Sequence, residues 1–339
     1  MAAPNKQLLL RQRPTGMPDR SHFSLVEAPL TDPEEGGVLV RVLFLSIDPT
    51  NRIWMSDRDQ YLPPVALGAV MRGAGVGRVV ASRSPKFREG DVVTGLLGWQ
   101  EYARLPAAEA AGLSVVPAGF PLPLSALLGV CGLTGVTAWY GLHDIAAARA
   151  GETVVVSAAA GAVGSIVGQL GKIAGCRVVG IAGGPEKCAL LTGEFGFDAA
   201  VDYKREGWRA ALAEATPRGV DVDFENVGGD IMQAVMRRMN LGGRVALCGM
   251  ISGYNSEAPS LGDFGTVLMK RLTVRGFIVL DYADRWGEAV GKLAALVVQG
   301  RLRHRETMVD GLENAPDALA RLFDGSTTGK LVVRVDPAA

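Results

Sequence analysis

The pattern of hydrophobic positions changes near residue 125 of this 339-residue chain. Before that point, short β-branched runs such as GGVLVRVLFLSID, AGVGRVVAS and GDVVTGLL are each bounded by Gly, Pro or Asp. Runs of this kind between turn residues are typical of strands. We therefore expect residues 1–125 to form a β-rich domain, a small barrel of twisted strands.

From Thr153 onward, apolar runs alternate with helical patterns. The helical patterns include Glu186–Phe195, Trp208–Ala215 and Asp230–Met239, and the apolar runs are TVVVS, RVVGIA, AAVDY, VDVDFENV, RVALCG and LTVRGFIVL. Continuous apolar strands that alternate with helices predict a parallel sheet covered on both faces. Six such strands predict a doubly wound dinucleotide-binding domain, which we place at residues 126–300.

The C-terminal segment, residues 301–339, changes pattern again. It contains a helical run, ENAPDALARLF, and a strand-like run, GKLVVRV. We expect both to return to the first domain. The predicted fold class is therefore α/β, with a β-rich domain and a doubly wound domain.

A turn of small residues follows the first strand of the second domain. Its sequence AAAGAVG fits A-x-x-G-x-x-G, with Ala158, Gly161 and Gly164 at the marked positions. Glycines in a dinucleotide fingerprint permit a tight turn, a close approach of the pyrophosphate, and close packing of helix on strand. The next helix also offers N–H groups to phosphates. A turn that only packs helix on strand is the alternative, but the strand–turn–helix context favours a dinucleotide site.

The end of the second strand indicates which dinucleotide binds. An acidic residue usually holds the ribose 2′-OH of NAD there, but this chain has Gly183 and Gly184, followed by Lys187. A lysine can form a charge-assisted hydrogen bond with a 2′-phosphate. The alternative is a solvated lysine at a helix start, where the helix dipole disfavours a cation. We therefore expect NADPH as the cofactor.

Charge and composition exclude several function classes. Lys plus Arg and Asp plus Glu both total 35 without a marked run of either sign, so we expect no nucleic-acid or membrane-surface partner. Residues 110–143 lack Asp, Glu, Lys and Arg, but Pro and Gly interrupt them, which favours a buried turn and core helix over a membrane span. Four scattered cysteines without CxxC and the absence of a signal-peptide pattern favour a reducing compartment, the cytoplasm.

Several motifs together resemble the zinc-independent medium-chain dehydrogenase/reductases, in particular the prostaglandin, 2-alkenal and curcumin reductase group. The resemblance covers nearly the whole chain. Its markers are AAAGAVG, GGPEKC, SIDPTNR (Ser46–Arg52), YLPPVALGAVMRG (Tyr61–Gly73), GLTGVTAWYGL (Gly132–Leu142), ENVGG (Glu225–Gly229), CGMISGYN (Cys248–Asn255), GFIV (Gly276–Val279) and a final GK (Gly329–Lys330).

The resemblance implies a GroES-like catalytic domain, a Rossmann domain that binds NADPH, and reduction of a C=C bond conjugated to a carbonyl. The substrate would be a small enone or enal. The resemblance also implies a homodimer formed through the last strand of the second domain, LTVRGFIVL. The cofactor-binding residues that it implies are Gly161, Ala162, Val163, Gly164, Gly183, Lys187, Tyr203, Asn226, Cys248, Gly249, Ser252, Tyr254, Phe277, Ile278 and Val279.

Two positions depart from the pattern of the resembled group. That group often has a tyrosine after its Asp-Pro, where this chain has Thr50. It often has an asparagine two places before the final Gly-Lys, where this chain has Thr327. The first departure bears on the substrate pocket and the second on one cofactor contact.

The sequence gives no support for a catalytic metal or a hydrolytic nucleophile. The three histidines, His22, His143 and His304, lie in no G-H-E motif and at no ligand spacing from a cysteine, so we expect no zinc. No G-x-S-x-G elbow is present. Asp48 and Arg52 are expected to fix the Asp-Pro turn and the start of a helix.

Enone reduction requires a hydrogen-bond donor to the developing enolate oxygen. Tyr254, in the loop after the fifth strand, is the first candidate, and Tyr61 is the second. The alternative is that both tyrosines only shape the pocket and that a cofactor ribose hydroxyl donates. Two other functions stay open at this point: a quinone reductase that uses NADPH, and a non-catalytic NADPH-binding protein.

Overall fold

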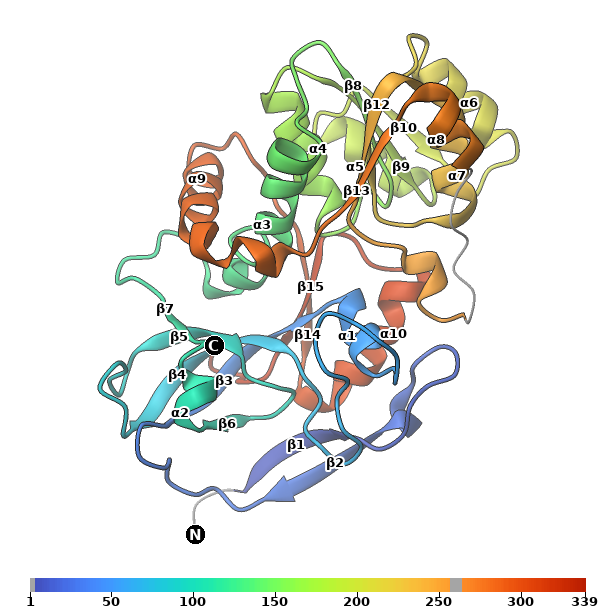
Figure 1. Cartoon of the computed structure of the whole chain (residues 1–339). Coiled ribbons are helices and arrows are strands. Elements are labelled where there is room, and N and C mark those ends of the chain that lie inside the picture. Colours follow the sequence, from blue (N-terminus) through green and yellow to red (C-terminus); the bar gives the residue numbers. More distant parts are fainter. Residues whose placement is uncertain (1–3, 257–263) are drawn as a thin grey trace. The chain divides into compact units, whose positions relative to one another are not determined.

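The computed structural model of the chain describes residues 4–256 and 264–339 (Figure 1). The chain divides into two units. The first comprises Met1–Leu128, Glu306–Thr327 and Leu331–Ala339, and the second comprises Gly129–Arg305 and Thr328–Lys330. The sequence analysis placed the boundaries after residues 125 and 300 and assigned all of 301–339 to the first domain, whereas Thr328–Lys330 belong to the second unit.

The first unit is built on one long central strand, β3 (Val38–Ile47). Nearly every residue of β3 is buried; Arg41 alone is exposed. The strand order of the surrounding sheet is β14-β15-β3-β4-β5-β7, and β6 also pairs with β3. The other strands of this sheet are β4 (Ala74–Ser82), β5 (Val92–Leu96), β6 (Tyr102–Leu105), β7 (Ser114–Val115), β14 (Glu306–Asp310) and β15 (Lys330–Arg334).

The remaining described elements of the first unit are a strand pair, three helices and three 3-10 turns. A second, two-stranded antiparallel sheet pairs β1 with β2. These elements are β1 (Asn5–Leu10), β2 (Phe23–Ala28), α1 (Pro49–Trp54), α2 (Ala107–Ala110), α10 (Ala315–Asp324), and the 3-10 turns η1 (Arg20–His22), η2 (Leu124–Leu128) and η6 (Leu312–Asn314).

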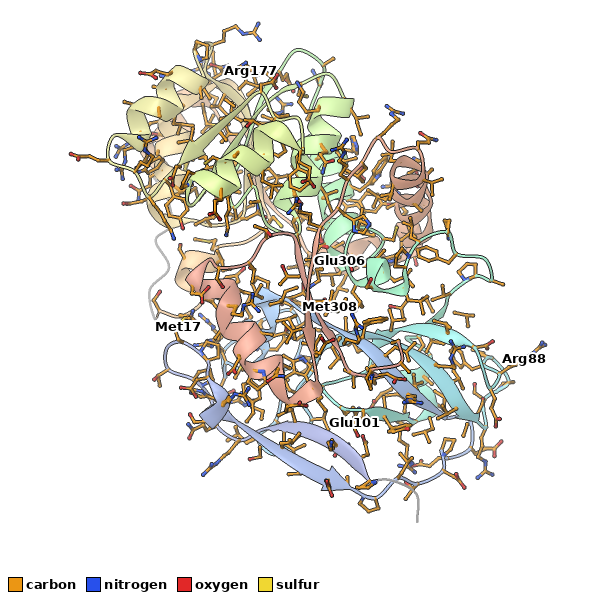
Figure 2. The ribbon with its side chains drawn as sticks, turned by 180° about the vertical axis from the view of Figure 1, so that it is seen from behind. Met17, Arg88, Glu101, Arg177, Glu306 and Met308 are labelled. Carbon is orange, nitrogen blue, oxygen red and sulfur yellow. The ribbon has the colours of Figure 1, made fainter. Side chains whose placement is uncertain are left out.

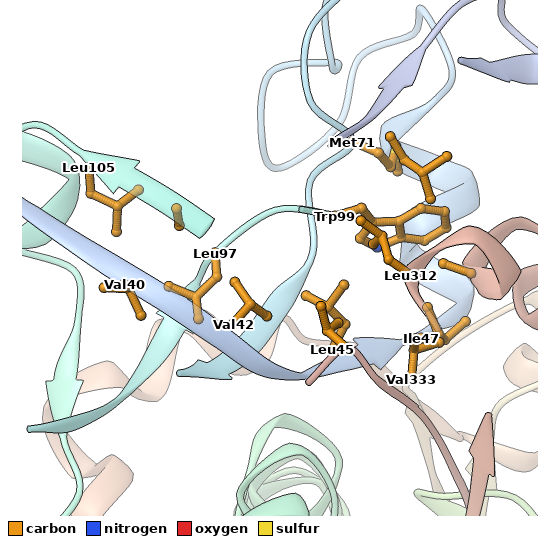
Figure 3. Close-up of a cluster of buried hydrophobic side chains, with 14 of the residues drawn as sticks. Val40, Val42, Leu45, Ile47, Met71, Leu97, Trp99, Leu105, Leu312 and Val333 are labelled. Carbon is orange, nitrogen blue, oxygen red and sulfur yellow. The ribbon is translucent and has the colours of Figure 1, made fainter. Parts of the chain in front are cut away.

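The core of the first unit combines side chains from both ends of the chain (Figure 3). Leu45 and Trp99, from the N-terminal part, are buried in one cluster with Leu312 and Val333 from the C-terminal part. Burial of such side chains is the dominant stabilising term in folding. The C-terminal segment is therefore part of the core of this unit, and Glu306 and Met308 belong to its strand β14 (Figure 2).

The Asp-Pro turn begins helix α1 as expected from the sequence. Asp48 is the N-cap, and its backbone N–H donates to Asn51 Oδ1 at 2.8 Å. Pro49 occupies the first helical position, where its missing N–H costs nothing. Arg52 donates to the carbonyl oxygens of Pro14 and Gly16, which anchors the N-terminal segment to the helix.

The second unit contains a six-stranded sheet of order β10-β9-β8-β11-β12-β13, and its neighbouring strands are parallel (Figure 1). The predicted doubly wound sheet is confirmed, since the order reverses between the first and fourth strands. The strands are β8 (Thr153–Val156), β9 (Arg177–Ala182), β10 (Ala199–Asp202), β11 (Val220–Glu225), β12 (Met239–Leu247) and β13 (Thr273–Gly276).

Helices cover both faces of this sheet. Leu212 of α6 and Val235 of α7 are buried with Val179 on one face, whereas Leu191 of α5 lies near Gly180 on the other. The helices are α3 (Leu133–Tyr140), α4 (Gly164–Ile173), α5 (Pro185–Gly193), α6 (Trp208–Ala215), α7 (Gly229–Arg238), α8 (Phe264–Lys270) and α9 (Trp286–Val298), with the shorter turns η3 (Gly141–Ile145), η4 (Ile251–Gly253) and η5 (Val279–Arg285).

The last strand is shorter than its apolar sequence predicts. The run LTVRGFIVL suggested a strand throughout, but β13 ends at Gly276. The ring of Phe277 meets Phe224 edge-on at 6.5 Å between centroids, and Val279 is buried in a cluster with Val136 and Tyr140. These residues are apolar because they enter the interior of the unit, not because they continue the strand.

Within the charge-free segment 110–143, the turn η2 and the eight-residue helix α3 are buried as expected, whereas most of residues 111–123, with strand β7, are exposed. No helix of the described residues is long and apolar enough to cross a membrane.

Arg177 lies at the amino-terminal edge of the parallel sheet. Its side chain donates to the carbonyl of Ala215, which ties the start of β9 to the end of α6 (Figure 2).

Candidate functional site

The turn after β8 has the geometry of a phosphate-binding loop. Ala158, at the first marked position of the motif, has φ +47, a left-handed conformation that usually favours glycine. A Cβ on Gly164 would lie 2.5 Å from the carbonyl oxygen of Ala158, so only glycine lets α4 pack this close to β8. A Cβ on Gly161 would meet only the Ala158 oxygen, at 3.2 Å, so this part of the backbone is accessible.

The start of α4 lies directly beside this turn. Val163 is the N-cap of α4, and Gly161 forms an isolated β-bridge with Gly329. N–H groups at a helix N-terminus attract anions, and the helix dipole adds to the attraction. Open backbone at Gly161 and the N-terminus of α4 beside it together fit a dinucleotide pyrophosphate.

The C-terminal Gly-Lys lies against the same turn. The Gly329 N–H donates to the Ala160 carbonyl at 2.9 Å, and Lys330 lines a small cavity together with Ala162 and Ser165. A Cβ on Gly329 would lie 2.1 Å from the carbonyl oxygen of Arg305, which explains the glycine at this position. The buried Lys330 therefore lies next to the turn that carries the predicted pyrophosphate site.

The segments after β9 and β10, at the next pair of strand ends, carry Lys187, Tyr203 and Lys204. A Cβ on Gly183 would lie 3.0 Å from both the Tyr203 ring and the Lys204 side chain, so these two side chains lie next to the glycine. The Asp202 carboxylate accepts hydrogen bonds from the N–H groups of Gly184 and Lys204, which joins the two loops. No carboxylate follows β9 directly, since Gly183 and Gly184 occupy these positions.

Lys187 occupies the first turn of α5 and is half-buried. Tyr203 is 38% exposed, and Lys204 is exposed. The structure therefore places Gly183 and Tyr203 together, as the resemblance implied, and adds Lys204, which the sequence analysis missed. The sequence signal for Lys204 is its position directly after Tyr203, a residue predicted to lie near the 2′-phosphate.

Asn226 is held at the ends of β8 and β11, next to the reversal of strand order. Its backbone N–H donates to Ser157 Oγ at 2.7 Å, and its side-chain amide donates to the Ser157 carbonyl at 2.8 Å. Ser157 Oγ in turn donates to Glu225 Oε1 at 2.7 Å. Because ligands of doubly wound folds bind at this reversal, Asn226 occupies a position suited to the nicotinamide half of the cofactor.

The loop after β12 is hydrogen-bonded onto the loop after β11. The N–H groups of Cys248 and Gly249 both donate to the Glu225 carbonyl. The N–H of Ile251 donates to the Asn226 carbonyl, and Ser252 donates to the Val227 carbonyl through both its N–H and its hydroxyl. The structure therefore brings the predicted residues Asn226, Cys248, Gly249 and Ser252 together.

Tyr254 lies in the same assembly. Its phenol oxygen accepts the N–H of Met250 at 3.2 Å, and a Cβ on Gly249 would lie 3.1 Å from this oxygen. The hydroxyl is therefore oriented by its own loop, close to Gly249 and to the loop that carries Asn226. Glycine at position 249 leaves room for this phenol.

The acidic groups at the end of β11 and directly after β12 have raised pKa values. Burial raises the pKa of Glu225, and hydrogen bonds from Ser157 and from backbone N–H groups oppose the shift. Burial raises the pKa of Asp223 well above its ordinary value, and the nearby Glu225 adds to the effect. Burial, with a further contribution from Glu225, raises the pKa of the Cys248 thiol to about 12, so this cysteine is a neutral thiol and not a nucleophile.

The segment Phe277–Val279, which the resemblance predicts to contact the cofactor, directs two of its three side chains inward. The side chains of Phe277 and Val279 pack into the interior of the unit. Ile278 is half-buried and extended. A contact between this segment and a cofactor therefore depends on main-chain groups and Ile278.

Tyr61 belongs to the first unit. Its hydroxyl forms a hydrogen bond with Thr50 Oγ1, from the first turn of α1. Burial raises the pKa of Tyr61, against the opposing effect of this hydrogen bond, so the phenol keeps its proton at neutral pH. Thr50, where the resembled group often has tyrosine, therefore serves as a hydrogen-bond partner for the second candidate donor.

The histidines are distributed as single residues. His22 closes the turn η1 with Asp19, and His143 contacts the Trp139 ring at 4.5 Å between centroids. In residues 4–256 and 264–339, no three His, Cys, Asp or Glu side chains are grouped closely enough to hold a metal ion.

Comparisons with known proteins match both units. Residues 6–113 match a family model described as the N-terminal domain of oxidoreductase, and residues 162–295 match one described as zinc-binding dehydrogenase. The chain is 43% identical over 339 residues to the NADPH-dependent curcumin reductase of Escherichia coli (strain K12), covering 98% of this chain and 97% of the relative.

Two further matches are similar in extent. The chain is 41% identical over 337 residues to the 2-alkenal reductase (NADP(+)-dependent) of Nicotiana tabacum, covering 98% of this chain and 97% of the relative. The crystal structure of CurA in complex with NADPH from Vibrio vulnificus superposes with a TM-score of 0.91 at 41% identity, covering 98% of this chain and 99% of that chain.

The two family models and the parallel sheet define an oxidoreductase with a dinucleotide-binding domain. With these full-length relatives, the chain belongs to the medium-chain dehydrogenase/reductase family, in the group that includes curcumin and 2-alkenal reductases.

Proposed function

We propose that this chain is an NADPH-dependent reductase that transfers hydride to the C=C bond of α,β-unsaturated carbonyl compounds. The observation that carries this proposal is the full-length similarity to reductases named for NADPH, curcumin and 2-alkenals. The glycine turn, the lysine-bearing segments after β9 and β10, and the joined loops after β11 and β12 support this proposal.

The preference for NADPH rests on the adenine end of the proposed site. Gly183 and Gly184 replace the carboxylate that would bind the 2′-OH of NAD and repel a 2′-phosphate. Lys187 and Lys204 supply positive charge, and Tyr203 supplies a ring beside Gly183. Charge-assisted hydrogen bonds to a phosphate favour NADPH over NADH.

The reaction requires a hydride at the β-carbon and a proton at the α-carbon. The bound cofactor supplies the hydride; the C=C π electrons move toward the carbonyl, and negative charge develops on its oxygen. Tyr254 is the first candidate to donate a hydrogen bond to this oxygen, and Tyr61 is the second. A proton from solvent or from a tyrosine hydroxyl then reaches the α-carbon and completes the saturated product.

Turnover assays test this function directly. The purified chain is incubated with NADPH and a small enone, an enal or a quinone, and NADPH absorbance is followed in parallel with NADH. Oxidation of NADPH by the enone or enal, with a saturated carbonyl as product, is the expected result. Turnover of the quinone alone identifies a quinone reductase, and NADPH binding without any turnover identifies a non-catalytic protein.

We also propose that the chain forms a homodimer through β13. This strand lies at the end of the six-stranded sheet, and all four of its residues, Thr273–Gly276, are exposed. An exposed edge strand offers unpaired N–H and C=O groups to a second copy across a two-fold axis. Light scattering should give twice 35.6 kDa; a monomer at micromolar concentration would contradict the proposal.

A further inference from the structure

Ser157 is the last residue before the glycine turn, and its side chain is completely buried. The hydroxyl donates to Glu225 Oε1 and accepts the backbone N–H of Asn226, each at 2.7 Å. The Ser157 carbonyl accepts the side-chain amide of Asn226. One buried serine therefore holds both the backbone and the side chain of Asn226.

Glu225 is the acceptor at the centre of the same hydrogen-bond network. Its Oε1 accepts the Ser157 hydroxyl and the N–H groups of Val227 and Gly228, the latter at 2.9 Å. Three donors to one oxygen of a fully buried side chain fix the course of the chain after β11. Gly228 has φ +77, which lets the backbone turn around the carboxyl group.

The loop that carries Tyr254 is built on the same segment. Its residues Cys248 and Gly249 donate to the Glu225 carbonyl, and Ile251 and Ser252 donate to the next two carbonyls of the chain. A shift of residues 225–227 would therefore move Asn226 and the Tyr254 loop together. The Ser157–Glu225 pair lies where the ends of β8 and β11 meet, since these strands are paired neighbours.

We propose that Ser157 and Glu225 are positioning residues that fix Asn226 and the Tyr254 loop for the nicotinamide half of NADPH. This inference rests on the proposed function. Neither residue needs to touch the cofactor; Ser157 acts through Asn226, and Glu225 acts through Ser157 and the backbone of the loop. The adenine half contacts other loops, so the two halves of the site should respond differently when the pair is broken.

The test compares two ligands that share the adenine half. NADPH carries both halves, whereas adenosine 2′,5′-bisphosphate carries the adenine, its ribose and the 2′-phosphate without nicotinamide. Calorimetric titration of each ligand into wild type and Ser157→Ala should show NADPH binding weakened about tenfold, the effect of losing one to two neutral hydrogen bonds. Binding of the bisphosphate should stay within about twofold of wild type.

A matched control removes another buried hydroxyl of the same unit. Thr216 is completely buried, and its Oγ1 donates to the Leu212 carbonyl, before the amino end of β11. Thr216→Ala should lower the thermal stability but leave the affinity for both ligands unchanged. Ser157→Cys, which replaces the hydroxyl by a slightly larger thiol and weakens both hydrogen bonds, is the second network variant and should show the same split between ligands.

Three outcomes would overturn the inference. Unchanged NADPH affinity in Ser157→Ala or Ser157→Cys would mean that the pair has no positioning role. Equal weakening of NADPH and the bisphosphate would mean that the substitution perturbs the whole unit. Failure of the wild-type chain to bind either ligand would overturn the proposed cofactor itself, and the positioning role with it.

Discussion

The two ends of the proposed cofactor site are built in opposite ways. At the adenine end, Lys187 is half-buried, Lys204 is exposed, and Tyr203 is 38% exposed. At the nicotinamide end, Ser157 and Glu225 are completely buried and hydrogen-bonded to each other. Positive side chains at the surface serve one end, and a buried hydrogen-bond network serves the other.

This difference follows from what each end must do. A phosphate is recognised by charge, and a lysine on a flexible stem can adjust to it. Hydride transfer depends on the placement of the reacting atoms, and a small misplacement is costly. Flexible charges therefore suit binding at the adenine end, while fixed loops suit chemistry at the nicotinamide end.

The largest effect is expected at the nicotinamide end. Tyr254→Phe removes one hydroxyl, whose oxygen accepts the Met250 N–H. If this hydroxyl stabilises the developing enolate, kcat should fall by roughly tenfold to a thousandfold. NADPH affinity, measured separately by fluorescence, should change little because the ring remains. Unchanged kcat and KM would remove Tyr254 from the mechanism, and a raised KM with unchanged kcat would assign it to substrate binding.

A substitution at the adenine end should affect the choice of cofactor instead. Lys187→Ala removes a positive charge near the predicted 2′-phosphate, so NADPH binding should weaken by roughly tenfold to a hundredfold. NADH lacks this phosphate and should bind as before. Titration of both cofactors checks the prediction, with Lys86→Ala in the first unit as an exposed-lysine control. Equal loss for NADPH and NADH would show that Lys187 does not recognise the phosphate.

Lys204 should contribute less than Lys187. It is exposed, and its backbone N–H, not its ammonium group, makes the hydrogen bond to Asp202. Solvent and salt screen such a charge, so Lys204→Ala should weaken NADPH about threefold and leave NADH unchanged. The effect should shrink as salt rises from 50 to about 500 mM. A loss that is independent of salt would argue against a role for charge at this position.

The smallest expected effect is on the stability of the fold, and it involves Asp223 of β11. Asp223 shares its face of the sheet with Val155 and Val245, and within the described chain neither of its carboxyl oxygens has a hydrogen-bond partner. Its pKa in the folded state is raised by burial. The folded state thus keeps a proton that the unfolded state releases, and the free energy of unfolding decreases as pH rises from the unfolded pKa toward the folded pKa.

Asp223→Asn removes this titration and keeps the size of the side chain. The variant should melt about 2–4 °C above wild type at pH 8, and the difference should shrink toward pH 5. Asp221→Asn is a matched control on the same strand, because Asp221 accepts hydrogen bonds from Thr153 and Asn240. The control should not be stabilised; an equal gain in both variants would contradict a specific cost of Asp223.

The sequence predicted the framework of both ends but not the contacts that hold them. Periodicity predicted the six parallel strands, because buried parallel strands are continuous apolar runs. The glycine turn and Lys187 were also readable, since they are local in sequence. The hydrogen bonds that join Ser157 with Asn226 and with Glu225 span 68–69 positions of the chain, and only the folded sheet brings these residues together.

The apolar sequence around the last strand predicts a longer strand than the structure contains. LTVRGFIVL predicts one long strand, yet the strand ends at Gly276, and Phe277 and Val279 pack into the interior. A short apolar run does not distinguish a strand from any other buried segment. Thr50 was noticed as a departure from the resembled group, but its hydrogen bond with Tyr61 required the structure.

Transfer of a labelled hydride distinguishes the proposed chemistry from its alternatives. The chain is incubated with an enone and NADPH that carries two deuterium atoms at C4 of the nicotinamide, and the product is analysed by NMR spectroscopy and mass spectrometry. One deuterium at the β-carbon of a saturated ketone is the predicted result. Deuterium on the carbonyl carbon of an alcohol, or no deuterium in any product, would contradict C=C reduction by this chain.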